Sequence, residues 1–217
     1  MPFRVRYQTI EFDSVDIHLC TLRDKQQFSD LLGEAESMGI SSAQWSLFGV
    51  VWESSEILAR EMQHFDIKNK RILELGCGIG LSSLLLNSRH ADITATDIHP
   101  LAGQFLADNV RLNHGRQIPF LRTAWNDGSL GLGLFDVIIG SDVLYERQHI
   151  EMLANFILLH AQPNCEVILV DPGRGNHASF SKKMLSFDFS HAQRKPIYAD
   201  DYTGSLKGQI LTYGRIQ

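Results

Sequence analysis

The segment LELGCGIG, residues 73–80, decides which folds the rest of the chain can adopt. An apolar strand in this segment runs directly into a turn with glycine at positions 76, 78 and 80. Because glycine has no Cβ atom, the backbone N–H groups of such a turn can approach a ligand closely. In an open α/β sheet, ligands bind where the strands end, at their carboxyl edge. The segment therefore predicts a ligand site at the end of a parallel strand.

The spacing of the glycines separates two classes of nucleotide cofactor. A dinucleotide-binding turn has the spacing GxGxxG, which counted from Gly76 would place its third glycine at Leu81. This chain instead has GxGxG, the spacing that resembles S-adenosylmethionine enzymes. Asp97 ends the next apolar segment, where a carboxylate can accept hydrogen bonds from ribose hydroxyls. The two features predict S-adenosyl-L-methionine as the cofactor, and a nicotinamide cofactor is the more distant alternative.

The composition is that of a soluble, folded protein. The chain has 217 residues, of which 44% are hydrophobic and 21% charged, and its net charge is −5. This balance argues against nucleic acid as the main partner, because phosphate binding requires a basic face. Its three cysteines form no CxxC pair and its histidines have no metal-ligand spacing, so no metal site is expected. No segment resembles a signal peptide or a membrane span, so we expect a cytoplasmic protein without a membrane partner, and a monomer by default.

From residue 54 onward, segments of helical periodicity alternate with apolar segments of strand length. Predicted strands cover residues 4–12, 15–22, 70–75, 91–97, 118–123, 134–142, 165–171, 186–193 and 208–216, and predicted helices cover 54–65, 81–88, 100–113 and 149–160. Alternation of this kind indicates an α/β protein with a doubly wound, mostly parallel seven-strand sheet. The last two strands are separated by a polar loop, so we expect an antiparallel C-terminal strand. The first two strands predict an N-terminal β-hairpin, and a short helix and a loop are expected to follow it.

Four short motifs give the chain a resemblance to a known family. They are LELGCGIGLSS (73–83), VVWESSEILAREM (50–62), TAWND (123–127) and IIGSDVLYE (138–146). The chain resembles the class I, Rossmann-like methyltransferases with seven strands. Within them it is similar to the protein lysine methyltransferases with a D-x-x-Y motif after the fourth strand, such as those of the methyltransferase-like 21 type. The resemblance implies an N-terminal hairpin and helical extension over residues 1–50 and a single methyltransferase domain over residues 51–217.

The resemblance also assigns site residues. Those expected to bind the cofactor are Trp52, Glu74, Gly76, Cys77, Gly78, Gly80, Asp97, Trp125 and Ser141. Among them, Asp97 would hold the ribose hydroxyls, Trp125 would lie against the adenine, and Trp52 would pack near the cofactor. Asp142 and Tyr145 would be the catalytic residues that face the acceptor. Because a carboxylate raises the pKa of a nearby lysine, Asp142 is expected to orient the ammonium rather than to act as a strong base.

Two features of the sequence are not part of the usual pattern of these D-x-x-Y lysine methyltransferases. Glu53 stands where the family usually has a proline. The segment VDPGRGNH (170–177) resembles relatives of the lysine methyltransferase that acts on the electron-transfer flavoprotein β subunit. Arg174 in this segment is either a solvated loop charge or a partner for an acidic patch of a substrate. Asp142 has a plainer alternative role as the cap of the next helix.

The acceptor class has several alternatives. Enzymes of this superfamily that methylate adenine or exocyclic amides carry an N/D-P-P-Y-like motif after the fourth strand, whereas this chain has SDVLY (141–145). A protein lysine is therefore the first hypothesis. A histidine or small-molecule acceptor on the same fold is the second, and a non-catalytic S-adenosylmethionine-binding protein is the third.

Overall fold

The computed structural model describes residues 3–128, 131–197 and 208–215 of the chain. The strands, in chain order, are β1 (Val5–Phe12), β2 (Val15–Leu22), β3 (Arg71–Leu75), β4 (Asp92–Asp97), β5 (Phe120–Arg122), β6 (Phe135–Ser141), β7 (Ala161–Asp171), β8 (Ala192–Arg194) and β9 (Gln209–Arg215). The helices are α1 (Glu34–Ser37), the 3₁₀ helix η1 (Trp45–Gly49), α2 (Glu53–His64), α3 (Leu81–Ser88), α4 (Ala102–Leu112), α5 (His149–His160) and α6 (His177–Leu185).

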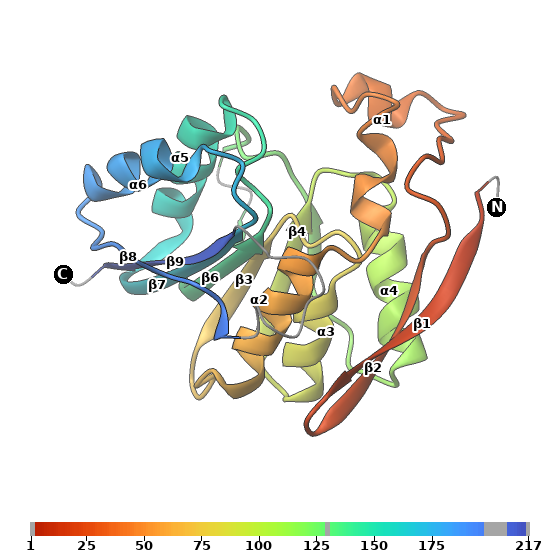
Figure 1. Cartoon of the computed structure of the whole chain (residues 1–217), viewed down its shortest axis with the longest axis horizontal. Coiled ribbons are helices and arrows are strands. Elements are labelled where there is room, and N and C mark those ends of the chain that lie inside the picture. Colours follow the sequence, from red (N-terminus) through yellow and green to blue (C-terminus); the bar gives the residue numbers. More distant parts are fainter. Residues whose placement is uncertain (1–2, 129–130, 198–207, 216–217) are drawn as a thin grey trace.

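Seven of these strands form one sheet, and β1 and β2 form a separate hairpin beside it (Figure 1). The strand order in the larger sheet is β5-β4-β3-β6-β7-β9-β8. Neighbours from β5 to β7 pair in parallel, whereas β9 is antiparallel to both β7 and β8. The predicted doubly wound sheet, its antiparallel C-terminal strand and the N-terminal hairpin are therefore confirmed.

Helices cover the sheet on both faces because its central strands are apolar at successive positions. On β3, Ile72 belongs to a core shared with α2, α3 and α4, whereas Leu73 belongs to a second core shared with α5 and α6. On β6, Val137 and Ile138 divide between the two cores in the same way. Successive side chains of a strand point to opposite faces, so an uninterrupted apolar run buries both.

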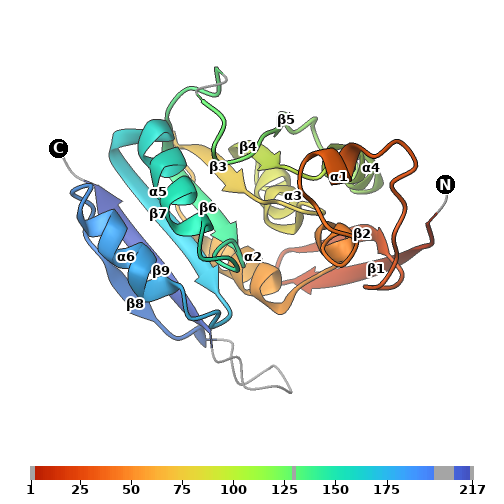
Figure 2. The ribbon, with the colours of Figure 1, turned by 90° about the horizontal axis from the view of Figure 1, so that it is seen from above.

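The N-terminal hairpin packs against α3 and α4, at the opposite end of the molecule from α6 (Figures 1 and 2). Leu19 and Leu22 are fully buried in the core that also contains α4. The backbone N–H of Cys20 donates a hydrogen bond to the Asn109 side chain at 2.7 Å, and His18 does the same to Asn113 at 2.8 Å. The hairpin thus shares its core with the larger sheet, and the division of the chain at residue 50 stays a prediction.

The C-terminal region differs from the predicted strand over residues 186–193. Helix α6 occupies the preceding residues, and the only strand in this part is the shorter β8. The apolar alternation around Phe187 and Phe189 belongs to a turn that ends α6, in which both backbone N–H groups donate to the carbonyl of Met184 at 3.0 and 3.3 Å. Asp188 reverses the chain there with a φ of 63°. The predicted range was wrong, and only its last two residues belong to β8, because helix termination places two phenylalanines two residues apart, as a strand would.

The other member of the C-terminal pair is present as β9. Its predicted range was 208–216, and the last residue of that range lies outside the described residues. β8 and β9 pair in the antiparallel sense that the sequence predicts. Within the described ranges, no helix is both long enough and apolar enough to cross a membrane.

Candidate cofactor and acceptor site

The carboxyl edge of the sheet brings together the segments that the sequence singles out. β3 ends at the glycine turn, β4 ends at Asp97, and Trp125 follows β5. On the other side of β3, Asp142 directly follows β6 and Arg174 follows β7. The strand order reverses here, because the chain runs from β3 outward to β4 and β5 and then returns to β6. These residues therefore lie at the switch point, where open α/β sheets bind ligands.

The glycine turn is shaped by close contacts within the protein. Gly76, Gly78 and Gly80 have φ angles of 57°, 56° and 81°, which residues with a side chain rarely adopt. A Cβ atom on Gly78 would lie 2.7 Å from the carbonyl oxygen of Phe48 in η1. A Cβ atom on Gly76 would lie 3.9 Å from the ring of Trp125. The N-terminal segment thus borders the turn on one side and Trp125 on another.

Cys77 and Ser141 lie at the ends of the two strands nearest the switch point. The backbone N–H of Cys77 donates to the carbonyl of Thr96 at 2.9 Å, which ties the turn to β4. Burial raises the pKa of the Cys77 thiol well above its usual value, so the thiol stays neutral and acts as a small packing group. Ser141 is half-buried and ends β6, in register with Val170 on β7.

The carboxylate of Asp97 is held in place by backbone donors. One oxygen accepts a hydrogen bond from the N–H of Gly78 and the other from the N–H of His99, both at 2.8 Å. Burial raises the pKa of Asp97, and these two hydrogen bonds act in the opposite direction. A carboxylate has about four lone-pair positions, so these two hydrogen bonds leave capacity for further donors. The arrangement leaves Asp97 able to bind a pair of hydroxyl groups.

Glu74 is turned into the protein, toward the first turn of α3. One of its oxygens accepts hydrogen bonds from the backbone N–H of Ser83, at 3.0 Å, and from the Ser83 hydroxyl. The side chain is buried, and burial raises the pKa of Glu74 to about 7 against the effect of the Ser83 hydrogen bonds. Its direct contacts therefore fix α3 beneath the glycine turn, and its assignment to the cofactor stays a prediction.

The raised pKa of Glu74 predicts how stability depends on pH. The native state holds this proton between pH 4.5 and about 7, where the unfolded chain has released it. The associated free energy of unfolding is present below pH 4.5 and is lost as the pH rises through about 7. It amounts to roughly 3 kcal/mol. A Glu74→Gln variant keeps an oxygen for Ser83, so it should lose this dependence and have a higher Tm than the wild type at pH 8. Thermal unfolding from pH 5 to pH 8 measures the effect, and parallel curves for the two proteins would contradict it.

Trp52 is tied to the N-terminal segment. It occupies the N-cap position of α2, its indole N–H donates to the carbonyl of Leu47 at 2.8 Å, and the ammonium of Lys25 lies 4.6 Å from its ring centre. Glu53, which replaces the usual proline, takes the first helical position. A carboxylate there is favoured by the helix dipole, and α2 begins at Glu53 without a proline.

His149 contacts two of the predicted aromatic site residues. The sequence did not indicate it as a site residue. Its ring lies edge-on to Trp125 at 5.1 Å and to Tyr145 at 4.5 Å. The residue is buried, and burial lowers its pKa, so the imidazole is neutral at physiological pH. A histidine at the first position of a helix carries no signal in the sequence; only the packing of α5 against the loop after β6 reveals it.

Tyr145 faces solvent in part and remains protonated. The residue is 44% exposed, yet burial raises its pKa, as do the charges of Asp97, Glu146 and Asp142, to about 12. The phenol is therefore a neutral hydroxyl across the physiological range and can both donate and accept hydrogen bonds.

Asp142 and Arg174 form a two-point ion pair across the ends of β6 and β7. The guanidinium Nε lies 2.9 Å from one carboxylate oxygen and Nη2 lies 2.6 Å from the other. Asp142 has a φ of 52°, and its N–H donates to the carbonyl of Val170 at 2.9 Å. Strained backbone of this kind at a non-glycine residue is concentrated at functional sites. Helix α5 has Gln148 at its N-cap, so the alternative role of Asp142 as the cap of that helix is wrong.

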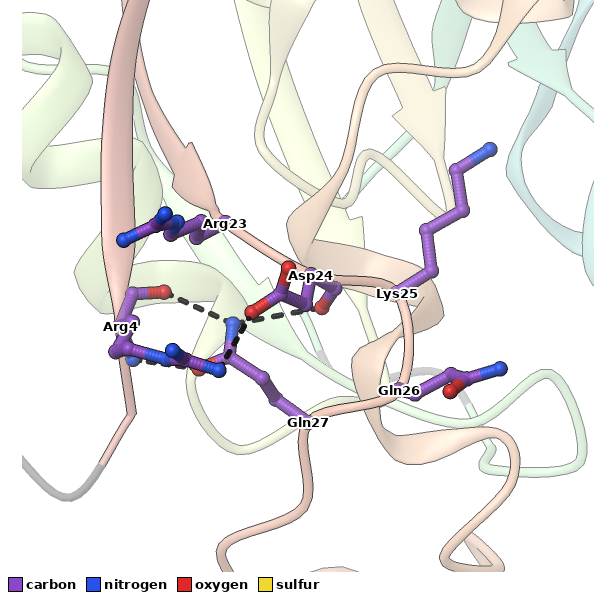
Figure 3. A pocket seen from close by; sticks show the side chains of 6 residues that line it. All are labelled: Arg4, Arg23, Asp24, Lys25, Gln26 and Gln27. Carbon is purple, nitrogen blue, oxygen red and sulfur yellow. Dashed lines mark hydrogen bonds and ion pairs between the residues drawn. The ribbon is translucent and has the colours of Figure 1, made fainter.

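A separate hollow is present on the N-terminal side of the chain (Figure 3). It has a volume of about 550 Å³ and is lined by Arg4, Arg23, Asp24, Lys25, Gln26 and Gln27. Arg4 pairs with Asp24 at 2.9 Å, and the amide of Gln27 donates to the carbonyl of Arg4 at 2.9 Å. Arg4, Asp24 and Gln27 thus bind one another, and none of the predicted site residues lines this hollow.

Comparison with known proteins agrees with this geometry. The chain is 36% identical to protein N-lysine methyltransferase METTL21A of Danio rerio over 116 residues, which are 48% of this chain and 52% of that protein. It is 28% identical to mouse EEF1A lysine methyltransferase 3, over 66% of each chain. It is 29% identical to the rat electron transfer flavoprotein beta subunit lysine methyltransferase, over 65% of this chain and 55% of that one. The matches span about half to two thirds of the length of these relatives.

The solved structures show the fold alone. The Thermus thermophilus 16S rRNA N2 G1207 methyltransferase, solved in complex with AdoMet and guanosine, superposes with a TM-score of 0.66 at 14% identity. That alignment covers 97% of this chain and 50% of the other.

The family model of lysine methyltransferases matches residues 36–186, which include every predicted site residue. The chain therefore belongs to the lysine methyltransferase family.

Proposed function

We propose that this chain is an S-adenosylmethionine-dependent methyltransferase that methylates lysine side chains of a protein. The observation that carries the proposal is the placement of Asp97 at the end of β4 and of Asp142 and Tyr145 just after β6, the two strands that flank β3. One side of the glycine turn then offers a carboxylate to a nucleoside. The other side offers polar groups to an acceptor.

The described residues fit this cofactor. Asp97 keeps lone pairs for two ribose hydroxyls, and Trp125 provides an apolar wall beside Gly76. Glu74 fixes α3 beneath the turn through Ser83, and its direct contact with the cofactor stays a prediction. When bound, the cofactor supplies a methyl group that is already activated on a positively charged sulfur.

Asp142 and Tyr145 align the acceptor. The lysine nitrogen must be neutral, because its lone pair forms the new N–C bond while the bond from the methyl carbon to sulfur breaks. The protein contributes mainly orientation, which can account for a large part of the rate. Asp142 accepts a hydrogen bond from the amine, and the neutral hydroxyl of Tyr145 contacts it and limits the entry of water. The nitrogen releases its surplus protons to solvent.

A protein is the proposed acceptor because the relatives that match this chain are named for protein substrates. The net charge of −5 supports a partner other than nucleic acid. We also propose that the protein is cytoplasmic and monomeric. A histidine or small-molecule acceptor, and a protein that binds the cofactor without turnover, are the competing outcomes of the test.

The test begins with calorimetric titration of S-adenosylhomocysteine, with NADH as the control ligand. Tritiated S-adenosylmethionine is then added together with a cytosolic extract, and labelled protein is hydrolysed for amino-acid analysis. We expect binding of S-adenosylhomocysteine alone and label recovered as methyl-lysine.

Each other outcome changes the proposal in a defined way. Label on histidine or only in small molecules would replace the lysine acceptor. Binding without label on any acceptor would indicate a non-catalytic protein. Absence of binding would overturn the cofactor itself.

A further inference from the structure

Arg174 and Asp142 form a matched ion pair at the place proposed for the acceptor amine. The guanidinium contacts both carboxylate oxygens, at 2.9 and 2.6 Å, which is the forked geometry that arginine makes with a carboxylate. The Asp142 side chain is only 15% exposed, so solvent screens its charge poorly, whereas Arg174 is 46% exposed. The pair therefore sets the local charge at this position.

Two further groups face the pair from β7 and α6. Asp171, at the end of β7, is buried and lies close enough to influence the charges of both Asp142 and Arg174. One of its oxygens accepts the N–H of Gly173 at 3.1 Å, and His177 Nδ1 lies 3.6 Å from the same oxygen. On this side, the guanidinium of Arg174 thus contacts the carboxylate of Asp142 and also interacts with the charge of Asp171.

The loop after β6 adds more acidic and neutral groups. The charges of Glu146 and Asp142, and that of Asp97 from the other side of β3, all act on Tyr145. His149 lies against Tyr145 and is neutral. Without Arg174, the negative charge of Asp142 would be left unpaired at the proposed acceptor position.

A strongly negative site would work against methyl transfer. A lysine has an ordinary pKa of about 10.4, and a nearby carboxylate raises it by roughly 1 to 3 units. Each unit lowers the neutral fraction at physiological pH about tenfold. A carboxylate that is already paired still has lone pairs on both oxygens, so it can orient an amine by hydrogen bonding.

We propose that Arg174 is a positioning residue that offsets the charge of Asp142, so that Asp142 orients the acceptor lysine without holding it in its protonated form. This inference rests on the proposed function. The guanidinium of Arg174 neutralises the charge of the Asp142 carboxylate. The lone pairs of Asp142 that remain free can still accept a hydrogen bond from the acceptor amine. Side-chain hydrogen bonding to Asp142 raises the pKa of Arg174, so the guanidinium keeps its charge throughout.

The test compares the wild type with Arg174→Gln from pH 7 to pH 10. The acceptor is the protein that the wild type labels, purified from the extract, and S-adenosylmethionine is saturating. We expect kcat at pH 7.5 to fall about tenfold and the difference to close as the pH rises, because the profile shifts about one unit to the alkaline side. KM for the acceptor should stay the same or fall, since an unpaired Asp142 attracts the ammonium more strongly.

Rescue and control variants separate charge from structure. Arg174→Lys should restore most of the wild-type profile, because it restores a positive charge. Arg194→Gln is the matched control: Arg194 also pairs with a carboxylate, Glu61, with side-chain exposures of 47% and 14%. The Arg194–Glu61 pair joins β8 to α2, so the Arg194→Gln variant should leave the pH profile unchanged. Repeating both profiles with His177→Gln excludes the imidazole beside Asp171 as the source of the shift.

Two results would overturn the proposal. A loss of kcat by the same factor at every pH would make Arg174 a structural clamp. A gain in activity at every pH would mean that Arg174 competes with the acceptor for Asp142. If the wild type binds S-adenosylhomocysteine but labels no protein, the proposed function has failed, which is distinct from either result.

Discussion

Replacing Asp142 with asparagine is expected to slow methyl transfer at least about 100-fold while leaving the affinity for S-adenosylhomocysteine within about twofold of the wild type. The carboxylate follows β6, on the side of β3 proposed for the acceptor, whereas Asp97, the proposed ribose ligand, ends β4 on the other side. The variant keeps the size of the side chain but loses the charge and one acceptor oxygen. Asparagine also tolerates the φ of 52° at this position, so the fold should be retained. Single-turnover kinetics and calorimetry on the same sample measure the two quantities.

Asp188→Asn is the matched control for this change. Asp188 is another aspartate with positive φ among the described residues, at 63°, and it lies in the turn that ends α6. Its substitution should alter neither binding nor transfer. Full activity in Asp142→Asn would remove Asp142 from the catalytic residues, and loss of cofactor binding would place it on the nucleoside side instead.

Asp97→Ala should weaken S-adenosylhomocysteine binding by about 10- to 100-fold, which corresponds to the loss of one charge-assisted hydrogen bond or more. The same change removes the acceptor for the N–H groups of Gly78 and His99, so the turn loses part of its internal support. Calorimetry gives the affinity, and the Tm measured with and without ligand shows whether the apo protein remains folded. An unchanged affinity would refute the assignment of Asp97 to the ribose.

Asp136→Ala controls for the loss of a carboxylate that binds backbone. The Asp136 carboxylate accepts the N–H of Arg71 at 2.8 Å, and both residues lie at the amino ends of their strands, the opposite edge of the sheet. This variant should lose some stability and keep its affinity for S-adenosylhomocysteine. A similar loss of affinity in both variants would mean that the effect of Asp97→Ala is structural.

The sequence was sufficient to predict most strands and helices, and to place the candidate site at the carboxyl edge of the sheet. Apolar strands alternate with helices of matching length, so the parallel sheet and the common edge of Asp97 and Asp142 follow from local patterns. The differences between the predicted and the observed elements also have local causes. The strand predicted over residues 186–193 was misplaced because Phe187 and Phe189, in the turn that ends α6, imitate a strand, and α6 itself was not predicted.

Only the tertiary structure decided what the site residues contact. Arg174 meets Asp142 across 32 positions of sequence, and Phe48 approaches Gly78 from the N-terminal segment. Neither contact has a periodic signal, because each depends on which strand ends become neighbours and on which loops fold back over them. The sequence by itself determined that a carboxylate would stand at the end of β6. The neighbouring strand β7 decided that this carboxylate is paired, because parallel pairing of the two strands brings the loop that carries Arg174 to the same edge.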